Sequence, residues 1–170
     1  MTKEEFLKDV ANWDNHRFLL WPALEATTGE VIEMGMGQGS TPFLHQYCKD
    51  ANRKLFSYES SLEWAMKFQD NISEGHHVMH VHDWDAVSLR HPFPDVVLID
   101  HAPGERRKTD ISLFAWKAKF IVCHDTEPAA DHGYQMRAEL SKFKYIKEYQ
   151  SPGAWSTVVS NFIDVSKFEI

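Results

Sequence analysis

The sequence contains few cysteines, no long apolar run and fewer basic than acidic residues. Its two cysteines, Cys48 and Cys123, are too few and too far apart for a disulfide framework or a cysteine zinc site, and each lies in an apolar stretch. We therefore expect two buried free thiols and a reducing compartment. No stretch approaches the roughly 20 apolar residues that a membrane span requires, and the start Met-Thr-Lys-Glu-Glu does not resemble a signal peptide. These absences predict a soluble cytoplasmic protein.

The shortage of basic residues limits the partners. The chain has 18 Lys and Arg against 25 Asp and Glu, which gives a formal net charge of −7. A main partner such as nucleic acid or an anionic membrane would require a basic face. The length of 170 residues suits one domain with a sizeable core, and no repeat or Gly/Ser/Pro linker divides it. We predict a single domain over residues 1–170, with neither a nucleic-acid nor a membrane partner.

Strand-like and helix-like segments alternate through most of the chain. Five short segments are predicted strands: 30–35, 54–59, 77–82, 94–100 and 118–124. The first is a short apolar run and the fourth is apolar throughout, which is typical of buried strands. Helical crossovers between such strands produce a parallel sheet with helices on both faces. Two further strand segments, 145–150 and 155–162, are separated only by Ser151–Ala154, which is too short for a crossover and predicts an antiparallel hairpin. The expected fold is α/β: a Rossmann-like, doubly wound, mostly parallel sheet of seven strands with a C-terminal antiparallel hairpin.

Capping patterns predict where helices begin. Thr2 and Glu5 form one capping box before an apolar stripe, and Ser60 and Glu63 form a second. A further helical pattern covers about residues 131–142.

The first 28 residues are predicted to form a helical cap or lid on the domain. Residues 16–27 have a helical pattern in which Pro22 should kink or restart the helix. No added substrate domain is expected in a chain of this length, so the lid comes from these helices or from a neighbouring subunit of a homodimer. Three aromatic side chains in this segment suit a cleft cover, a dimer face or the core: Trp13, Phe18 and Trp21.

A glycine-rich loop follows the first strand. Gly35, Gly37 and Gly39 alternate before Ser40 and a predicted helix start, an arrangement that lets the backbone approach an anionic or carboxylate-bearing ligand. Glu59 ends the second strand, where a carboxylate can accept hydrogen bonds from both hydroxyls of a ribose. Glycine pairs also end strands for structural reasons, and Glu59 can be a solvated strand end. The two features together favour a nucleoside-bearing cofactor.

Several segments resemble those of class I S-adenosylmethionine (SAM)-dependent methyltransferases. Val-Ile-Glu-Met-Gly-Met-Gly-Gln-Gly-Ser at 31–40 resembles the first motif of that family, and Tyr58-Glu59 resembles the second. The predicted hairpin is similar to the inverted last strand of the family. Segments 97–100 and 120–126 resemble those of small sugar and natural-product O-methyltransferases. The resemblance implies SAM as cofactor and a hydroxyl oxygen of a small molecule as methyl acceptor.

The resemblance also implies a set of cofactor-binding residues along the ends of the first three strands. Glu33 and the glycines would lie beside the methionine end of SAM, Glu59 would hold the ribose, and Asp83 and Trp84 would contact the adenine. A buried core role is the alternative for Trp84. The implied set is Glu33, Gly35, Gly37, Gly39, Ser40, Glu59, Ser60, Asp83 and Trp84.

The candidate reaction centre lies at the ends of the fourth and fifth strands. Asp100-His101 and His124-Asp125 occur there, and a hydroxyl acceptor needs a base to remove its proton. We predict His101, His124 and Asp125 as catalytic residues. If the two strands are neighbours, Asp100 and Asp125 converge, and such a pair can share a proton or bind Mg²⁺ that acidifies a substrate hydroxyl. The alternative is that Asp125 caps a turn and Asp100 only ends a strand.

Two other groups of residues allow a structural and a functional interpretation. Arg106 and Arg107 can clamp an anionic substrate or belong to a solvated helix start. A histidine cluster near the third strand can hold a transition metal, but we predict polar residues of a sheet edge. The cluster consists of His76, His77, His80 and His82.

Two other functions are alternatives to the methyltransferase hypothesis. One is a protein with the same fold that binds a ligand without transferring a methyl group. The other is a nucleotide-dependent oxidoreductase, which is disfavoured because the loop is Gly-x-Gly-x-Gly, not Gly-x-Gly-x-x-Gly, and because a terminal hairpin is expected.

Overall fold

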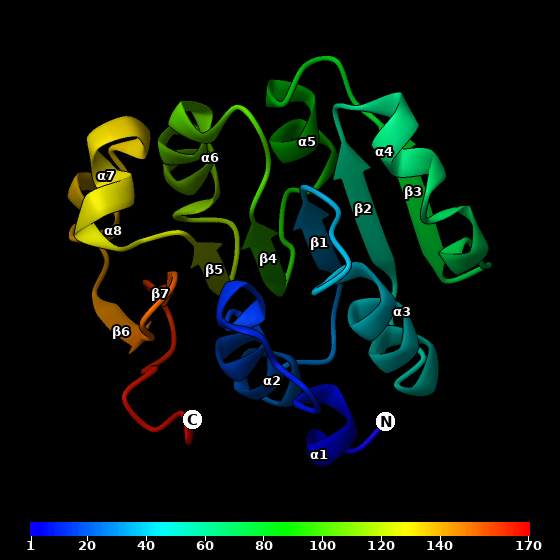
Figure 1. The fold of residues 1–170 in the computed structure, drawn as a ribbon, viewed down its shortest axis with the longest axis horizontal. Coiled ribbons are helices and arrows are strands. Elements are labelled where there is room, and N and C mark those ends of the chain that lie inside the picture. Colours follow the sequence, from blue (N-terminus) through cyan, green and yellow to red (C-terminus); the bar gives the residue numbers. More distant parts are fainter.

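The computed structural model describes residues 1–170, apart from the side chain of Asn12. Its centre is a seven-stranded sheet with the strand order β3-β2-β1-β4-β5-β7-β6 (Figure 1). The strands are β1 (Val31–Met34), β2 (Leu55–Glu59), β3 (His76–His80), β4 (Val96–Ile99), β5 (Phe120–His124), β6 (Tyr145–Gln150) and β7 (Trp155–Ser160). Strands β1 to β5 pair in parallel, whereas β7 pairs antiparallel with both β5 and β6. The predicted fold class, including the terminal hairpin, is confirmed.

Helices cover both faces of the sheet. Figure 1 shows α2 and α3 on one side of the strands and α5 and α6 on the other. The α-helices are α1 (Lys3–Phe6), α2 (Arg17–Glu25), α3 (Thr41–Asp50), α4 (Leu62–Met66), α5 (Asp85–Arg90), α6 (Arg107–Phe114), α7 (Pro128–Tyr134) and α8 (Arg137–Leu140). Three short 3₁₀ turns accompany them: η1 (Asn12–Asp14), η2 (Gln69–Asn71) and η3 (Gly104–Arg106). No helix among the described residues is long and apolar enough to cross a membrane.

Two apolar cores lie on the two faces because successive strand residues point to opposite sides. Val31 packs with α1, α2 and α3 on one face, and the next residue, Ile32, packs with α5, α6 and α8 on the other. Both cysteines are buried free thiols, as predicted. The central strands β1, β4 and β5 are buried along their whole length, which explains why their sequences are apolar except for Glu33 and His124.

The edge strand β3 has a different pattern. His77 and His80 are exposed, whereas His76 is buried against the neighbouring strand. Polar side chains on an edge limit unwanted pairing with other chains. The prediction that the third strand is an edge is confirmed by the strand order.

Some predicted helix boundaries are wrong. The helix expected over 131–142 is two helices, α7 and α8, because Gln135 adopts a left-handed backbone with φ 55°. The N-cap of α4 is Ser61, which accepts from the Trp64 N–H; Ser60 was the predicted cap. The Thr2–Glu5 capping box is present as predicted. Helix α2 runs through Pro22 without restarting.

The N-terminal segment packs against the sheet and the hairpin. Phe6 and Leu24 belong to the core beneath β1, and Phe18 stacks on Tyr149 with ring centroids 4.6 Å apart. Trp13 is 70% exposed. A dimer face at Trp13 stays a prediction.

Candidate active site

The glycine loop begins where the chain leaving β1 packs on the backbone that follows β4. Gly35 has φ +92°, and a Cβ there would lie 2.5 Å from the His101 Cα. A side chain is therefore excluded at position 35 for two reasons: it would clash with the backbone of His101, and the positive φ of Gly35 is unfavourable for other residues. Gly37 differs, because a Cβ there would meet nothing closer than the Ser40 Oγ at 3.5 Å. The middle of the loop is accordingly an accessible backbone surface at the carboxyl end of the sheet.

Glu33 lies beneath this loop and is fully buried. Its carboxylate accepts hydrogen bonds from Ser40 Oγ at 2.6 Å, from Thr41 Oγ1 at 2.9 Å and from Ser57 Oγ. Thr41 Oγ1 in turn accepts from the Gly37 N–H at 3.0 Å. Burial raises the pKa of Glu33 to about 7, and the three hydroxyl donors oppose that rise. The structure therefore places Glu33 as a support of the loop, below the surface that a ligand on the loop would touch.

Glu59 joins the end of β2 to the same loop. Its Oε2 accepts from the Met36 N–H at 3.1 Å, and its Oε1 accepts from the Ser61 N–H at 2.8 Å. Ser60 beside it is exposed. Glu59 is thus fixed at the rim of the glycine loop, with carboxylate lone pairs left for another donor.

Asp83 and Trp84 follow β3 but occupy different environments. Asp83 is exposed and accepts from the Asp85 N–H at 3.0 Å, so its carboxylate is bonded to the first residue of α5. Trp84 is 6% exposed, and its ring stacks on the ring of His101 at a centroid distance of 4.1 Å. Trp84 therefore has the buried core position that was the alternative to an adenine contact.

The two predicted metal-binding carboxylates converge, but on an arginine. Asp100 and Asp125 follow the neighbouring strands β4 and β5. The Arg107 guanidinium lies 3.1 Å from Asp100 Oδ1 through Nη2 and 3.1 Å from Asp125 Oδ2 through Nη1. It also donates through Nε to the His101 carbonyl oxygen at 2.7 Å. The cation between these carboxylates is thus a side chain, at the place where Mg²⁺ was one of the alternatives considered from the sequence.

His124 and His101 differ in what surrounds their rings. His124 Nδ1 lies 3.4 Å from both Asp100 Oδ1 and Asp125 Oδ1. Burial lowers the pKa of His124, but the hydrogen bond to Asp100 and the two negative charges outweigh it and leave the pKa raised. His101 instead lies between Trp84 and Asp110, with Nε2 2.9 Å from Asp110 Oδ2. Of the two rings, His124 is the one held by the convergent carboxylates.

A residue that the sequence analysis did not select, His16, completes this cluster. Its ring centroid lies 5.1 Å from that of His124, and ligand atoms of His16, Asp100 and His124 all lie within 4.8 Å of one another. Burial and the neighbouring His124 lower the pKa of His16 to about 3, so the ring is neutral. Both His16 nitrogens and His124 Nε2 have no hydrogen-bond partner within the described part of the chain. A single histidine before an apolar helix carries no sequence signal for such a role.

Residues 14–16, here called the N-terminal strap, cross the carboxyl end of the sheet. A Cβ at Gly39 would overlap the Asp14 carboxylate, so Asp14 packs directly on the glycine loop. Asn15 Nδ2 donates to Ser151 Oγ at 3.0 Å and to the Ala154 carbonyl oxygen in the hairpin loop. The strap therefore extends from the glycine loop to the hairpin and passes His124 on the way.

The comparisons with known proteins identify the fold. No protein-family model matches the chain, and no curated protein sequence matches it. Among solved structures, an O-methyltransferase from Bacillus cereus in complex with SAH superposes with a TM-score of 0.68 at 13% identity, covering 91% of this chain and 83% of that one. The fold is that of class I SAM-dependent methyltransferases.

Two other structures with this fold differ in their partners. The cofactor-bound protein Rv0187 from MTB has a TM-score of 0.67 and 15% identity, covering 92% of this chain and 84% of that one. The hMettl16 catalytic domain in complex with a 3′UTR hairpin has a TM-score of 0.62 and 12% identity, covering 92% of this chain and 72% of that one.

The raised pKa of Glu33 leads to a stability prediction. Between its usual value of 4.5 and its folded value of about 7, the folded protein binds this proton more tightly than the unfolded chain, so Glu33 makes stability fall as pH rises. Glu33→Gln should remove this component. We expect the free energy of unfolding of wild type to fall relative to that of Glu33→Gln as the pH rises from 4.5 to 8. The relative change should reach up to about 3 kcal/mol, measured by urea denaturation.

The control is Glu169→Gln, at an exposed position. Its difference from wild type should stay flat over the same pH range. A flat difference for Glu33→Gln as well would mean that the buried carboxylate ionises normally.

Proposed function

We propose that the protein is a SAM-dependent methyltransferase that methylates a hydroxyl oxygen of a small molecule. The observation that carries the proposal is the glycine loop with Glu59 at its rim, at the carboxyl ends of β1 and β2 in a class I methyltransferase fold. Ligands of doubly wound sheets bind at this edge. The net charge of −7 favours a small acceptor over a nucleic acid.

The described residues fit the cofactor when the N-terminal strap is displaced. Gly37 leaves backbone accessible, and Glu59 retains acceptor capacity for the hydroxyls of a ribose. Buried nitrogens of His16 and His124 without partners supply hydrogen-bonding atoms for a polar ligand group in this part of the site. Asp14 packs on Gly39, so a ligand there requires this carboxylate to move. The predicted cofactor-binding set stays a proposal, except that Glu33 acts through the loop it supports and Trp84 is a buried residue stacked on His101.

The acceptor side of the site supplies a base. SAM brings a methyl group on a sulfonium, which is already a good leaving group. His124 Nε2 accepts the hydroxyl proton of the acceptor, while Asp100 and Asp125 stabilise the resulting imidazolium from the Nδ1 side. Arg107 fixes both carboxylates and supplies the positive charge between them. We therefore favour the base version of the reaction over the Mg²⁺ version, and His124 over His101.

The ribose assignment is tested by Glu59→Gln. Loss of the charged acceptor should weaken binding of S-adenosylhomocysteine about tenfold or more, measured by calorimetry, because hydrogen bonds to charged groups contribute roughly 1.5–3 kcal/mol. Glu63→Gln, an exposed change on the following helix, is the matched control and should bind as wild type. Equal affinity of Glu59→Gln and wild type, with both folded, would remove Glu59 from the site.

The base assignment is tested by a pH profile. Only neutral His124 can accept a proton, and its pKa is raised, so the transfer rate should increase with pH through a value above 6.5 and then level off. His124→Gln should lose about 100-fold or more of the rate together with this pH dependence. The rate is followed as S-adenosylhomocysteine release with a panel of hydroxylated small molecules.

The control for this test is His132→Gln, at an exposed position on α7. It should keep both the rate and the profile of wild type. Full activity of His124→Gln would contradict the mechanism. Cofactor binding without transfer to any acceptor would favour the non-catalytic alternative.

A further inference from the structure

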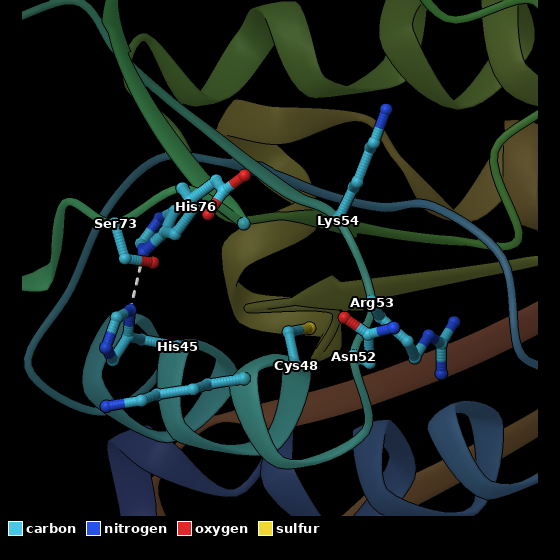
Figure 2. A pocket seen from close by; sticks show the side chains of 10 residues that line it. His45, Cys48, Asn52, Arg53, Lys54, Ser73 and His76 are labelled. Atoms are coloured by element: carbon cyan, nitrogen blue, oxygen red, sulfur yellow. Dashed lines mark hydrogen bonds between the residues drawn. The ribbon is translucent and has the colours of Figure 1, made fainter.

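A cavity of about 560 Å³ opens at the other end of the sheet from the glycine loop. Its walls are α3, the residues that precede β2 and the turn that precedes β3 (Figure 2). The volume is within the range of small-molecule sites. Its polar lining includes His45, Lys49, Arg53, Lys54, Ser73 and His76. None of these residues belongs to the proposed methyl-transfer site.

The cavity is basic in an acidic protein. Three cationic residues line it against one acid, Glu74, although the whole chain has a net charge of −7. Within the described structure, no carboxylate forms an ion pair with Lys49 or Lys54. Buried Arg53 adds positive charge behind the wall, but its N–H groups already donate to Leu24, Thr27 and Gly29, so the direct ligand contacts fall to the two lysines and His45. A ligand with more than one negative charge, such as a phosphate group, suits this lining.

A histidine pair forms one wall of the cavity. His45 reaches from α3 toward His76, and their Nδ1 atoms are 3.1 Å apart (dashed line in Figure 2). Two ring nitrogens approach this closely when one carries the proton and the other accepts it. The pair is therefore a directed hydrogen bond with two orientations.

The same pair begins a hydrogen-bond chain that ends at the glycine loop. His76 Nε2 lies 2.8 Å from Ser57 Oγ, and Ser57 donates to Glu33, which holds Ser40 and the loop. His76, Ser57 and Glu33 are buried side chains of the neighbouring strands β3, β2 and β1, whereas His45 is half-buried on α3. The chain connects the cavity wall with the proposed cofactor loop through the interior of the sheet.

The proton positions along the chain follow from Glu33. When Glu33 is ionised, its carboxylate only accepts, so Ser57 donates to Glu33 and accepts from His76 Nε2–H. Neutral His76 then accepts at Nδ1 from His45 Nδ1–H. An anion that hydrogen-bonds to protonated His45 requires this same orientation, because both ring nitrogens of His45 are then donors. Anion binding at His45 and ionisation of Glu33 therefore favour the same arrangement of protons along the chain.

We propose that this cavity binds a phosphate group and that the chain His45–His76–Ser57–Glu33 couples its occupancy to cofactor affinity at the glycine loop. Phosphate binding stands without the proposed function, whereas the coupling rests on it. Because coupling between two sites is reciprocal, cofactor and phosphate strengthen each other by the same factor.

The binding half is tested by calorimetric titration with inorganic phosphate. Wild type should show saturable binding that weakens with added salt. The double variant Lys49→Gln/Lys54→Gln should bind about tenfold more weakly, and Lys167→Gln, an exposed lysine near the chain end, should bind as wild type. Absence of saturable binding at millimolar phosphate, or equal binding by the double variant, would overturn the proposal.

A second arm distinguishes the source of the phosphate group. Adenosine 5′-monophosphate that binds at least as tightly as phosphate, with the same loss in the double variant, identifies a phosphorylated small molecule as the ligand class. Exclusion of the nucleotide with retention of phosphate identifies the free ion. Both results support a phosphate site.

The coupling half is tested by the dissociation constant of S-adenosylhomocysteine with and without saturating phosphate. Wild type should bind S-adenosylhomocysteine about fivefold more tightly with phosphate present. Ser57→Ala should bind phosphate normally but lose this enhancement, and His45→Phe, at a partly exposed position, breaks the chain in a second way if Ser57→Ala does not fold. No enhancement in wild type, or full enhancement in both variants, would overturn the coupling.

Failure of this inference can be distinguished from failure of the proposed function. If S-adenosylhomocysteine binds and phosphate does not, the cavity proposal fails and the proposed function stands. If phosphate binds and no S-adenosylhomocysteine binding is detected, the proposed function fails together with the coupling.

Discussion

The proposed site depends on the hydrogen bonds that hold the buried carboxylate of Glu33. A carboxylate enclosed in a protein core is unfavourable unless polar groups surround it. Here three hydroxyl groups donate to it, and they come from the start of α3 and from β2. The same contacts shape the loop between Gly35 and Thr41. Glu33 thus anchors the loop and, because its pKa is raised to about 7, changes its protonation state near neutral pH.

The opposite side of the proposed site is organised by a cation. Arg107 balances Asp100 and Asp125, and these two carboxylates surround Nδ1 of His124. Hydroxyl donors support the glycine loop, whereas a guanidinium supports the proposed acceptor side. This division suits the tasks that we propose for them, because a cofactor loop needs a fixed backbone and a catalytic base needs a charge that can change.

The sequence predicted what depends on local pattern. Apolar strand segments and the short loop at Ser151–Ala154 were sufficient for the parallel sheet with its inverted end, because crossover length decides strand direction. Gly35 was recognisable because its role is a backbone constraint that only glycine meets. Glu59 was recognisable because the end of the second strand has a fixed position relative to that loop.

What the sequence could not supply depends on contacts between distant segments. Arg107 reaches Asp125 across the space between two strands, and an arginine at a helix start gives no sign of this. His16 meets His124 in a strap that the neighbouring Asn15 ties to the hairpin loop, more than 100 residues along the chain. The predicted 131–142 helix is interrupted because Gln135 adopts a left-handed backbone conformation, which the helical pattern does not indicate.

The N-terminal strap is the feature that most constrains the proposed activity. It packs Asp14 on the glycine loop, so a cofactor has to displace it before binding. The most direct test is calorimetric titration of the wild-type protein with SAM, S-adenosylhomocysteine and NAD in parallel. The account predicts saturable binding of SAM and S-adenosylhomocysteine and no binding of NAD. Binding of NAD with no binding of either SAM or S-adenosylhomocysteine would contradict it.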